Sequence, residues 1–247
     1  GPARYRLLMA GLTRVPGSLN LLTKLAVGRE IRLPALGVLL TVFLAAFSTG
    51  CAPQAPLEPD LMGDVTMFRT GGADVSRNES SDVPGGLCMM GGGSEVDSAM
   101  RWFLRKAGGG DVVVVRASGS DGYQRYLYRE LGVEVNSVTT LRFDGPSAGP
   151  AALEILANAE AVWIAGGDQQ RYLELWMDAP VGDALQAAVD RGAAIGGTSA
   201  GMAVLGEHIW DGESLRTGFL RVPLLAGIIT DTHVDTRGRE PRHAQWV

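Results

Sequence analysis

The stretch DVVVVRAS, residues 111–118, places four consecutive valines before an arginine and two small residues. A short run of β-branched residues with no polar interruption is typical of a strand that is buried on both faces of a parallel sheet. Comparable short apolar runs lie on either side of it, at 87–90, 135–141, 161–167 and 193–197. Each of these runs predicts one more strand of the same sheet.

Segments with the apolar spacing of helices separate these runs. They read SEVDSAMRWFLRKA at 94–107, YQRYLYREL at 123–131 and PAALEILANA at 150–159, and a longer helical region covers 169–191. Alternation of strand and helix indicates βαβ units, whose right-handed crossovers place helices on both faces of a sheet. We therefore expect an α/β fold of the flavodoxin-like, doubly wound type with a mostly parallel sheet.

Glycine-rich and polar segments follow four of the expected strands. They are GGGS at 91–94, ASGS at 117–120, GGDQ at 166–169 and GTSAG at 197–201. Because a doubly wound sheet binds its ligand beyond the carboxyl ends of its strands, these segments should meet in one crevice. The first segment lacks G-x-G-x-x-G spacing, and Glu95 directly after it would repel phosphate, which argues against nucleotide binding.

The N-terminal residues have a different pattern, that of an export signal. Residues 33–47 are uncharged, follow two arginines and lead through small residues to Cys51. A small residue before cysteine resembles the lipobox of bacterial lipoproteins, in which the cysteine is acylated. We expect a signal over 1–50, lipidation at Cys51, and an exported, membrane-anchored protein on the periplasmic or cell-surface side. The alternative is an ordinary cleaved signal or an uncleaved anchor.

Composition sets the remaining organisation of the chain. Residues 51–86 are rich in Pro, Gly, Ser and Asp, which predicts a flexible linker before a folded domain over 87–247. The net charge of −5 combines six basic and one acidic side chain in the first 50 residues with about −10 in the rest. An acidic body argues against nucleic acid as a partner. The chain has two cysteines, Cys51 and Cys88, so a lipid on Cys51 would exclude a disulfide within one chain.

The motif GTSAG at 197–201 lies between an apolar run and helix-forming residues. A G-x-S-x-G motif between strand and helix is typical of a strained turn that exposes the serine hydroxyl. The N–H of Ala200 and the helix N-terminus would then point at a developing oxyanion. We interpret Ser199 as a nucleophile; in the alternative interpretation, the glycines only make a tight turn.

A serine nucleophile needs a base, and the chain has three histidines. His208 would lie about 13 Å from Ser199 along a continuing helix. His243 lies in a polar stretch near the end of the sequence. His233 follows the apolar run 224–229, which would bring it to the carboxyl edge of the sheet. We predict His233 as the base; the alternative is a strand-end histidine with no catalytic role.

The residues leave several candidates for the carboxylate that would orient this histidine. Glu213 is favoured among candidates that either lie between Ser199 and His233 or flank the histidine, namely Glu207, Asp211, Glu213, Asp231 and Asp235.

Five ordered motifs extend over residues 87 to about 242. They are MMGGGSEVD at 89–97, RASGSDGY at 116–123, IAGGDQ at 164–169, GGTSAGMAVLGE at 196–207 and ITDTHVDTRGR at 229–239. Together they resemble cyanophycinase and its bacterial relatives, a serine peptidase family that also contains α-aspartyl dipeptidase. The resemblance implies the class I glutamine-amidotransferase-like fold and a triad of Ser199, Glu213 and His233.

The resemblance also implies a substrate. Cyanophycinase splits cyanophycin, an aspartate polymer bearing arginines, at the β-aspartyl-arginine bond. The residues expected to recognise this substrate are Gln169, Asp231, Thr232 (where the family usually has Gln), Arg237, Arg239 and Arg242. An arginine cluster beside an acyl-transfer site could clamp substrate carboxylates, whereas the alternative is a solvated basic loop.

These inferences define the expected activity. We expect a serine exopeptidase that uses no metal or organic cofactor, with the oxyanion held by the N–H groups of Ala200, Gly92 and Gly93. The alternatives are a dipeptidase of the same family acting on α-aspartyl or other acidic dipeptides, and a non-catalytic surface lipoprotein that only binds a ligand. A homodimer is left open. The chain ends 14 residues after His233 whereas the family continues, so we expect the domain to be truncated at its C-terminus.

Overall fold

The computed structural model describes residues 62–72, 85–244 and 246. The expected signal segment and Cys51 lie outside these residues. In chain order the elements are β1 (Gly63–Gly71), β2 (Leu87–Met90), α2 (Asp97–Arg105), β3 (Asp111–Arg116), α3 (Gly122–Arg125), the π-helix η1 (Tyr126–Glu130), β4 (Ser137–Ala148), α4 (Pro150–Asn158), β5 (Ala161–Ile164), α5 (Gln169–Trp176), α6 (Pro180–Asp190), β6 (Ala194–Thr198), α7 (Ala200–Ala203), β7 (His208–Trp210), β8 (Leu215–Thr217), the 3-10 helix η2 (Pro223–Leu225) and α8 (Glu240–His243).

Six strands form the central sheet in the order β1-β4-β3-β5-β6-β2. The five strands from β2 to β6 are parallel to their neighbours, and β1 is antiparallel to β4. In β3 the four valines are all buried, as expected for a strand covered on both faces. The expected mostly parallel α/β sheet is confirmed. Because β2 lies at one edge, beside β6, the loop after the first parallel strand meets the loop after the last one.

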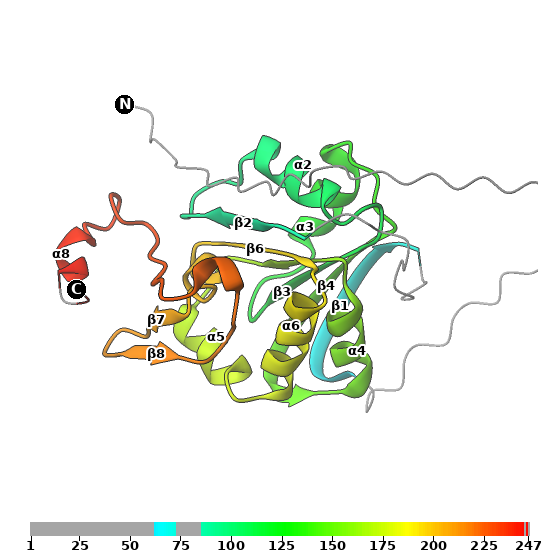
Figure 1. Ribbon diagram of the computed structural model, residues 1–247. Coiled ribbons are helices and arrows are strands. Elements are labelled where there is room, and N and C mark those ends of the chain that lie inside the picture. The colour runs from blue at the N-terminus through cyan, green and yellow to red at the C-terminus, as the bar shows by residue number, and fades with distance from the viewer. Residues whose placement is uncertain (1–61, 73–84, 245, 247) are drawn as a thin grey trace, which may run out of the picture. The chain divides into compact units, whose positions relative to one another are not determined.

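Helices cover both faces of this sheet (Figure 1). On one face, α2 and the α3–η1 segment pack on a core that includes Phe103, Leu127 and Trp163. On the other face, α4, α5 and α6 pack on a larger core that includes Leu156, Trp176 and Leu185. The edge-on contact of Phe103 with Trp163, at 5.2 Å between ring centroids, belongs to the first core.

Two boundaries differ from those expected from the sequence. Residues 63–71, assigned to a flexible linker, form β1 and pair along β4, so that part of the linker prediction is wrong. The polar composition around this strand concealed it, because an edge strand needs few apolar residues. The single helical region over 169–191 is divided into α5 and α6. Asp178 has a φ of 55° and Pro180 begins α6, which together interrupt the helix.

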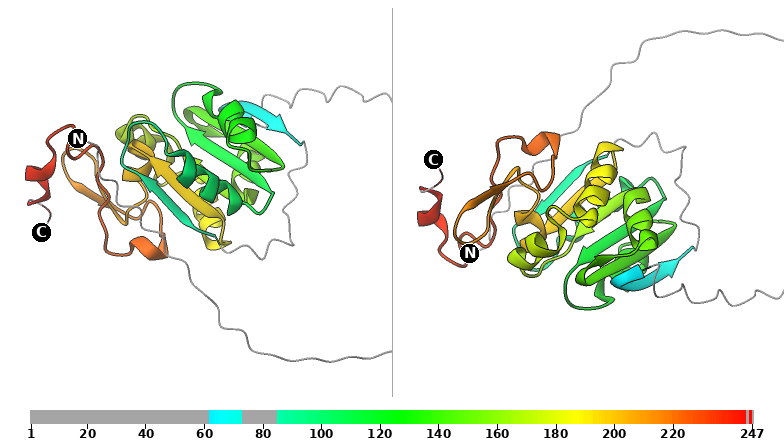
Figure 2. Two further views of the ribbon diagram at one scale, coloured as in Figure 1. Left: turned by 90° about the horizontal axis from the view of Figure 1, so that it is seen from above. Right: turned by 90° about the horizontal axis from the view of Figure 1, so that it is seen from below.

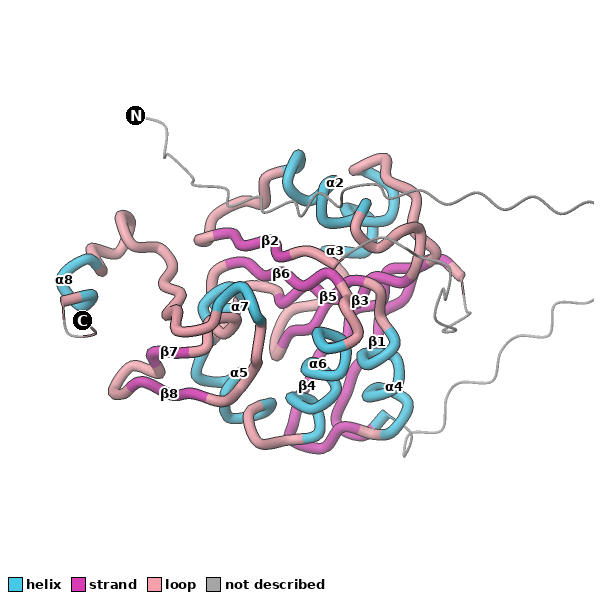
Figure 3. Tube along the Cα trace, viewed as in Figure 1, coloured by secondary structure: helices cyan, strands magenta, loops and turns pink. Residues whose placement is uncertain are grey.

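The last part of the described chain has little regular structure. After β6 and the short α7, the strands β7 and β8 form a two-stranded antiparallel sheet of their own. The segment from β8 to α8 is mostly loop (Figure 3). Both further views show β1 at one side of the sheet and the C-terminal segment at the other (Figure 2). None of the helices within the described ranges is long and apolar enough to cross a membrane.

Candidate active site

Ser199 occupies a strained turn between β6 and α7. Its φ of 51° and ψ of −119° lie in a region that non-glycine residues seldom adopt. Two glycines make this turn possible, because a Cβ at Gly197 would lie 2.5 Å from the backbone of Gly201, and one at Gly201 would overlap the carbonyl of Ile164. The Ser199 N–H donates to the carbonyl of Met90 in β2 at 3.0 Å, which fixes the turn against the neighbouring strand.

His233 lies directly against this serine. Its Nε2 is 2.8 Å from the Ser199 Oγ, within hydrogen-bonding distance. The His233 N–H donates to the Gly91 carbonyl at 2.9 Å, and its φ is 52°. The ring passes so close to Gly92 that a Cβ there would overlap it. The structure thus brings together the serine and histidine that the sequence singled out.

The environment of His233 keeps its imidazole neutral. Burial first, and then the positive charges of Arg237 and Arg239, hold the pKa of His233 below its ordinary value. A neutral imidazole has one nitrogen that can accept the serine proton. The electrostatics therefore favour the form of His233 that acts as a base.

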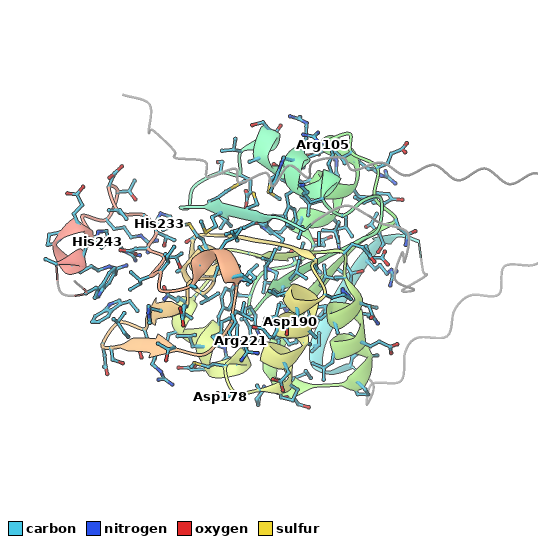
Figure 4. All side chains as sticks on the ribbon, in the orientation of Figure 1. Arg105, Asp178, Asp190, Arg221, His233 and His243 are labelled. Atoms are coloured by element: carbon cyan, nitrogen blue, oxygen red, sulfur yellow. The ribbon has the colours of Figure 1, made fainter. Side chains whose placement is uncertain are left out.

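The other two histidines contact residues other than Ser199. His208 belongs to β7, where it pairs with Thr217 in β8 and with Ile229. The Nε2 of His243 lies 2.8 Å from a carboxylate oxygen of Asp231. Figure 4 shows His243 on α8 and His233 on the segment that leads from α8 back toward the sheet. Of the three histidines, His233 is thus the one whose side chain contacts Ser199.

The backbone N–H groups expected at an oxyanion site come from the two loops around the serine. Ala200 begins α7, and N–H groups in the first turn of a helix have no partner within the helix. Gly92 and Gly93 follow β2 with φ values of 110° and 94°, which only glycine adopts readily. Gly93 lines the cavity that contains Ser199. The geometry places these groups near the nucleophile, and their role stays a prediction.

A cavity of about 310 Å³ opens at the carboxyl ends of β2, β3, β5 and β6. Three of the four loops expected to meet in one crevice line this cavity, and Arg116 and Tyr123, which flank the fourth loop at 117–120, line it in place of that loop. The lining residues are Gly93, Glu95, Arg116, Tyr123, Ala165, Gly166, Thr198, Ser199 and His233. The sequence analysis missed Glu95, Arg116 and Tyr123 as site residues. Their position within the motifs at 89–97 and 116–123 was the available signal.

Glu213, the favoured acidic member, lies in the exposed turn between β7 and β8. Asp211 closes this turn by accepting hydrogen bonds from the N–H groups of Glu213 at 2.9 Å and Ser214 at 2.8 Å. Glu213 lines a second hollow together with Gln170 and Arg216 rather than the cavity of Ser199. In the described part of the chain, no carboxylate is hydrogen bonded to His233. The structure therefore shows a Ser199–His233 pair, and the identity of the acid stays a prediction.

The expected substrate-binding residues contact one another. The Asp231 side chain, 8% exposed, forms ion pairs with Arg242 and with Arg239 at 3.4 Å, and its carboxylate lies 2.8 Å from Nε2 of His243. Buried Thr232 donates its N–H to Asp231 at 2.7 Å. Arg237 is exposed. Gln169 donates to the Trp210 carbonyl in β7 at 2.7 Å. Hence two of the three arginines expected to clamp a substrate are engaged within the protein.

Hydrogen bonds determine the charge of this buried aspartate. Although burial by itself would raise it, hydrogen bonds from Arg242, His243 and the N–H of Thr232 hold the pKa of Asp231 below its ordinary value. Asp231 is therefore an anion whose partners are supplied by residues 239–243.

The His, Cys, Asp and Glu side chains of the described residues are not arranged as a metal ion needs. Within residues 62–72, 85–244 and 246, no group of three or more His, Cys, Asp or Glu side chains is arranged to hold a metal ion. Cys88 is a buried free thiol in β2, and burial raises its pKa to about 11. A thiol with such a pKa is a poor nucleophile at neutral pH.

Comparison with known proteins agrees with this geometry. Residues 96–216 match the model of peptidase family S51. A cyanophycinase of Geminocystis herdmanii is 28% identical over 145 residues, which make up 54% of this chain and 53% of the relative. The chain thus spans about half the length of this relative. The crystal structure of a peptidase from an acI-B1 actinobacterium has the same fold, with a TM-score of 0.51 and 16% identity over 66% of this chain and 72% of that one.

Proposed function

We propose that the chain is a serine peptidase of the cyanophycinase-like S51 type, with Ser199 as nucleophile and His233 as base, because residues 96–216 match the model of that family. The observation that carries the proposal is the 2.8 Å separation of Ser199 Oγ and His233 Nε2 at a strained strand-to-helix turn. A hydroxyl and an imidazole at hydrogen-bonding distance are the minimum that nucleophilic catalysis by serine requires.

The reaction proceeds by acyl transfer. His233 Nε2 takes the proton of Ser199 as Oγ attacks the amide carbonyl, and N–H groups of Ala200, Gly92 and Gly93 stabilise the negative oxygen that develops. The protonated His233 then gives its proton to the leaving amine, and the C–N bond breaks. Water, deprotonated by His233, then attacks the acyl-serine, and His233 returns this proton to Ser199 Oγ as the bond from Oγ to the acyl carbon breaks and the acid product leaves. The pair alone performs these transfers, and a carboxylate would add orientation and stabilise the imidazolium.

A fluorophosphonate probe tests the nucleophile. The wild-type protein should be labelled at Ser199, and Ser199→Ala should abolish both labelling and amide hydrolysis without changing the thermal unfolding temperature. Ser98→Ala, at an exposed position of α2, is the matched control and should retain both. Hydrolysis by Ser199→Ala within tenfold of wild type would disprove the assignment. Absence of labelling in the wild type would favour the alternative of a ligand-binding lipoprotein without catalysis.

For the substrate, we propose a β-aspartyl-arginine bond of the kind found in cyanophycin. The similarity to cyanophycinase supports this choice, as does the exposed Arg237 near His233. The rival within the family is hydrolysis of α-aspartyl or other acidic dipeptides. A panel of α- and β-aspartyl dipeptides with arginine or alanine as the second residue separates them: preference for β-aspartyl-arginine supports the first, and equal rates on α-linked substrates support the second.

We also propose export and lipid anchoring through Cys51, on the grounds of the sequence pattern before it. Mass spectrometry of the mature protein expressed with its full N-terminal region should find an acylated Cys51 at the N-terminus, and Cys51→Ser should block this processing. An unmodified N-terminus elsewhere would refute lipidation.

A further inference from the structure

Two opposite charges line the cavity beside Ser199. Glu95 comes from the loop after β2, and Arg116 is the last residue of β3. In the sheet, β5 and β6 lie between β3 and β2, so Glu95 and Arg116 approach Ser199 from opposite sides. Both side chains are only partly exposed. The cavity is also lined by the small residues Ala165, Gly166 and Thr198.

Tyr123 connects the two sides of the cavity. Its hydroxyl donates a hydrogen bond to the Glu95 carboxylate, and the Arg116 guanidinium lies over its ring at 5.9 Å. Burial, followed by the hydrogen bond to Glu95, raises the pKa of Tyr123 well above its ordinary value, so the hydroxyl stays a donor. A carboxylate has lone pairs for several donors, so Glu95 can still accept from a ligand.

The loop after β3 is shaped around the Arg116 guanidinium. Arg116 donates through Nε to the carbonyl of Ser118 and through Nη1 to the carbonyl of Ser120 at 3.0 Å. The intervening Gly119 has a φ of 86°, and a Cβ there would overlap Nη2 of Arg116. From the outer side, Arg142 donates to the Gly119 carbonyl at 3.0 Å. Three successive carbonyls thus hold the loop against two guanidinium groups, and Arg116 is fixed in place.

We propose that Glu95 and Arg116 together recognise an acyl residue that carries a free ammonium and a free carboxylate, with its remaining carbonyl presented to Ser199. Glu95 takes the ammonium and Arg116 takes the carboxylate. An N-terminal aspartyl residue has these three groups whether it is linked through its α- or its β-carbonyl. The inference rests on the proposed function, and it assigns recognition of the acyl side to this pair in place of Arg239 and Arg242, which are bound to Asp231.

The test measures binding separately from hydrolysis. Calorimetry with Ser199→Ala protein compares L-aspartate, N-acetyl-L-aspartate, which lacks the ammonium, and L-aspartic acid diamide, which keeps the ammonium but lacks both carboxylates. The parent protein should bind L-aspartate more tightly than either analogue by roughly 10- to 150-fold, the range for a hydrogen bond to a charged group. Glu95→Gln should remove the discrimination against the N-acetyl compound, and Arg116→Gln the discrimination against the diamide.

Three further variants control for indirect effects. Gly119→Ala keeps the charge of Arg116 but displaces its guanidinium, and it should reproduce the loss of discrimination against the diamide. Glu130→Gln and Arg125→Gln remove the same charges from an exposed ion pair on η1 and α3, and both should bind all three compounds as the parent does. Thermal unfolding of each variant establishes that the domain is folded.

The outcomes separate this inference from the proposed function. If the folded Glu95→Gln and Arg116→Gln proteins discriminate as the parent does, or if the parent binds no aspartate, the inference is overturned even when Ser199-dependent hydrolysis is observed. If the parent discriminates and the variants do not, the inference stands even when the wild-type protein hydrolyses none of the dipeptides.

Discussion

At the residue scale, the end of β2 aligns the side chains of Ser199 and His233. The N–H of Ser199 donates to the Met90 carbonyl, and the N–H of His233 donates to the next carbonyl, that of Gly91. Both residues have positive φ, which costs about 1–3 kcal/mol each and persists only where the surroundings enforce it. Two consecutive carbonyls therefore hold two strained residues, 34 positions apart, at hydrogen-bonding distance.

Gly92→Ala tests this alignment. A Cβ at position 92 would overlap the His233 ring, so the imidazole must move away from Ser199. A displacement of about 1 Å can reduce turnover by about 100-fold, and we expect kcat to fall by about that factor. The matched control is Gly93→Ala, which has a similar positive φ of 94° but no neighbour within 4 Å of the added Cβ. Equal losses in the two variants would mean that backbone strain, and not the ring, is responsible.

Arg237 contributes to the pH range in which His233 could act as a base. Burial first, and then the positive charge of Arg237, lower the pKa of His233, so the acidic limb of the kcat/KM profile should lie below the ordinary histidine value of 6.5. Arg237→Gln removes that charge, favours the protonated imidazole and should move the limb to higher pH. Since Arg237 is exposed, the shift should shrink in high salt. Arg221→Gln, also exposed, is the control; an unchanged limb in Arg237→Gln would contradict the expectation.

At the scale of elements, α8 and Trp246 help to hold the loop that carries His233 in place. Arg242 and His243 of α8 bind Asp231, two residues before His233. Trp246 lies 5.7 Å from the Trp210 ring of β7, and the Trp210 carbonyl accepts from Gln169. These contacts connect α8, the histidine loop, β7 and the start of α5. The loop that carries His233 has little regular structure of its own, so these contacts contribute to its stability.

Arg242→Gln should weaken the contacts between α8 and the loop that carries His233. Loss of the charged partner leaves the buried Asp231 carboxylate less well compensated, and we expect the free energy of unfolding to fall by about 1–3 kcal/mol. Urea unfolding monitored by tryptophan fluorescence measures the change. Arg237→Gln removes an arginine that is not ion-paired with Asp231 and should leave stability within about 0.5 kcal/mol of wild type. A similar loss in both variants would exclude a specific role for the Asp231 pairs.

At the scale of the molecule, β1 completes the sheet on the side opposite β2. It pairs over Val65–Gly71 with β4, a 12-residue strand that would otherwise present a long open edge. Val65 and Met62 are buried in the larger core next to Phe143. An exposed long edge strand invites association with other chains. The folded domain therefore includes residues 62–72, upstream of the boundary expected at residue 87.

Truncation tests that boundary. Residues 87–247 produced alone should unfold at lower temperature and aggregate, because loss of Val65 and Met62 removes about 1.5–3 kcal/mol of apolar burial each and exposes β4. Residues 57–247 retain β1 and should behave as the full chain does in size-exclusion chromatography. A monomeric, equally stable 87–247 fragment would show that β1 is dispensable.

The sequence by itself determined the parallel sheet, because buried strands such as 111–116 and the helices between them have strong and distinct apolar patterns. It also singled out Ser199 and His233, since a G-x-S-x-G turn and a scarcity of histidines leave few choices, and the structure places their side chains 2.8 Å apart. Only the tertiary structure decided which charges face the cavity. Arg239 and Arg242 both pair with Asp231, and Glu95 and Arg116 come from separate parts of the chain. Ion pairs depend on distances across the fold, which a linear pattern of charges does not contain.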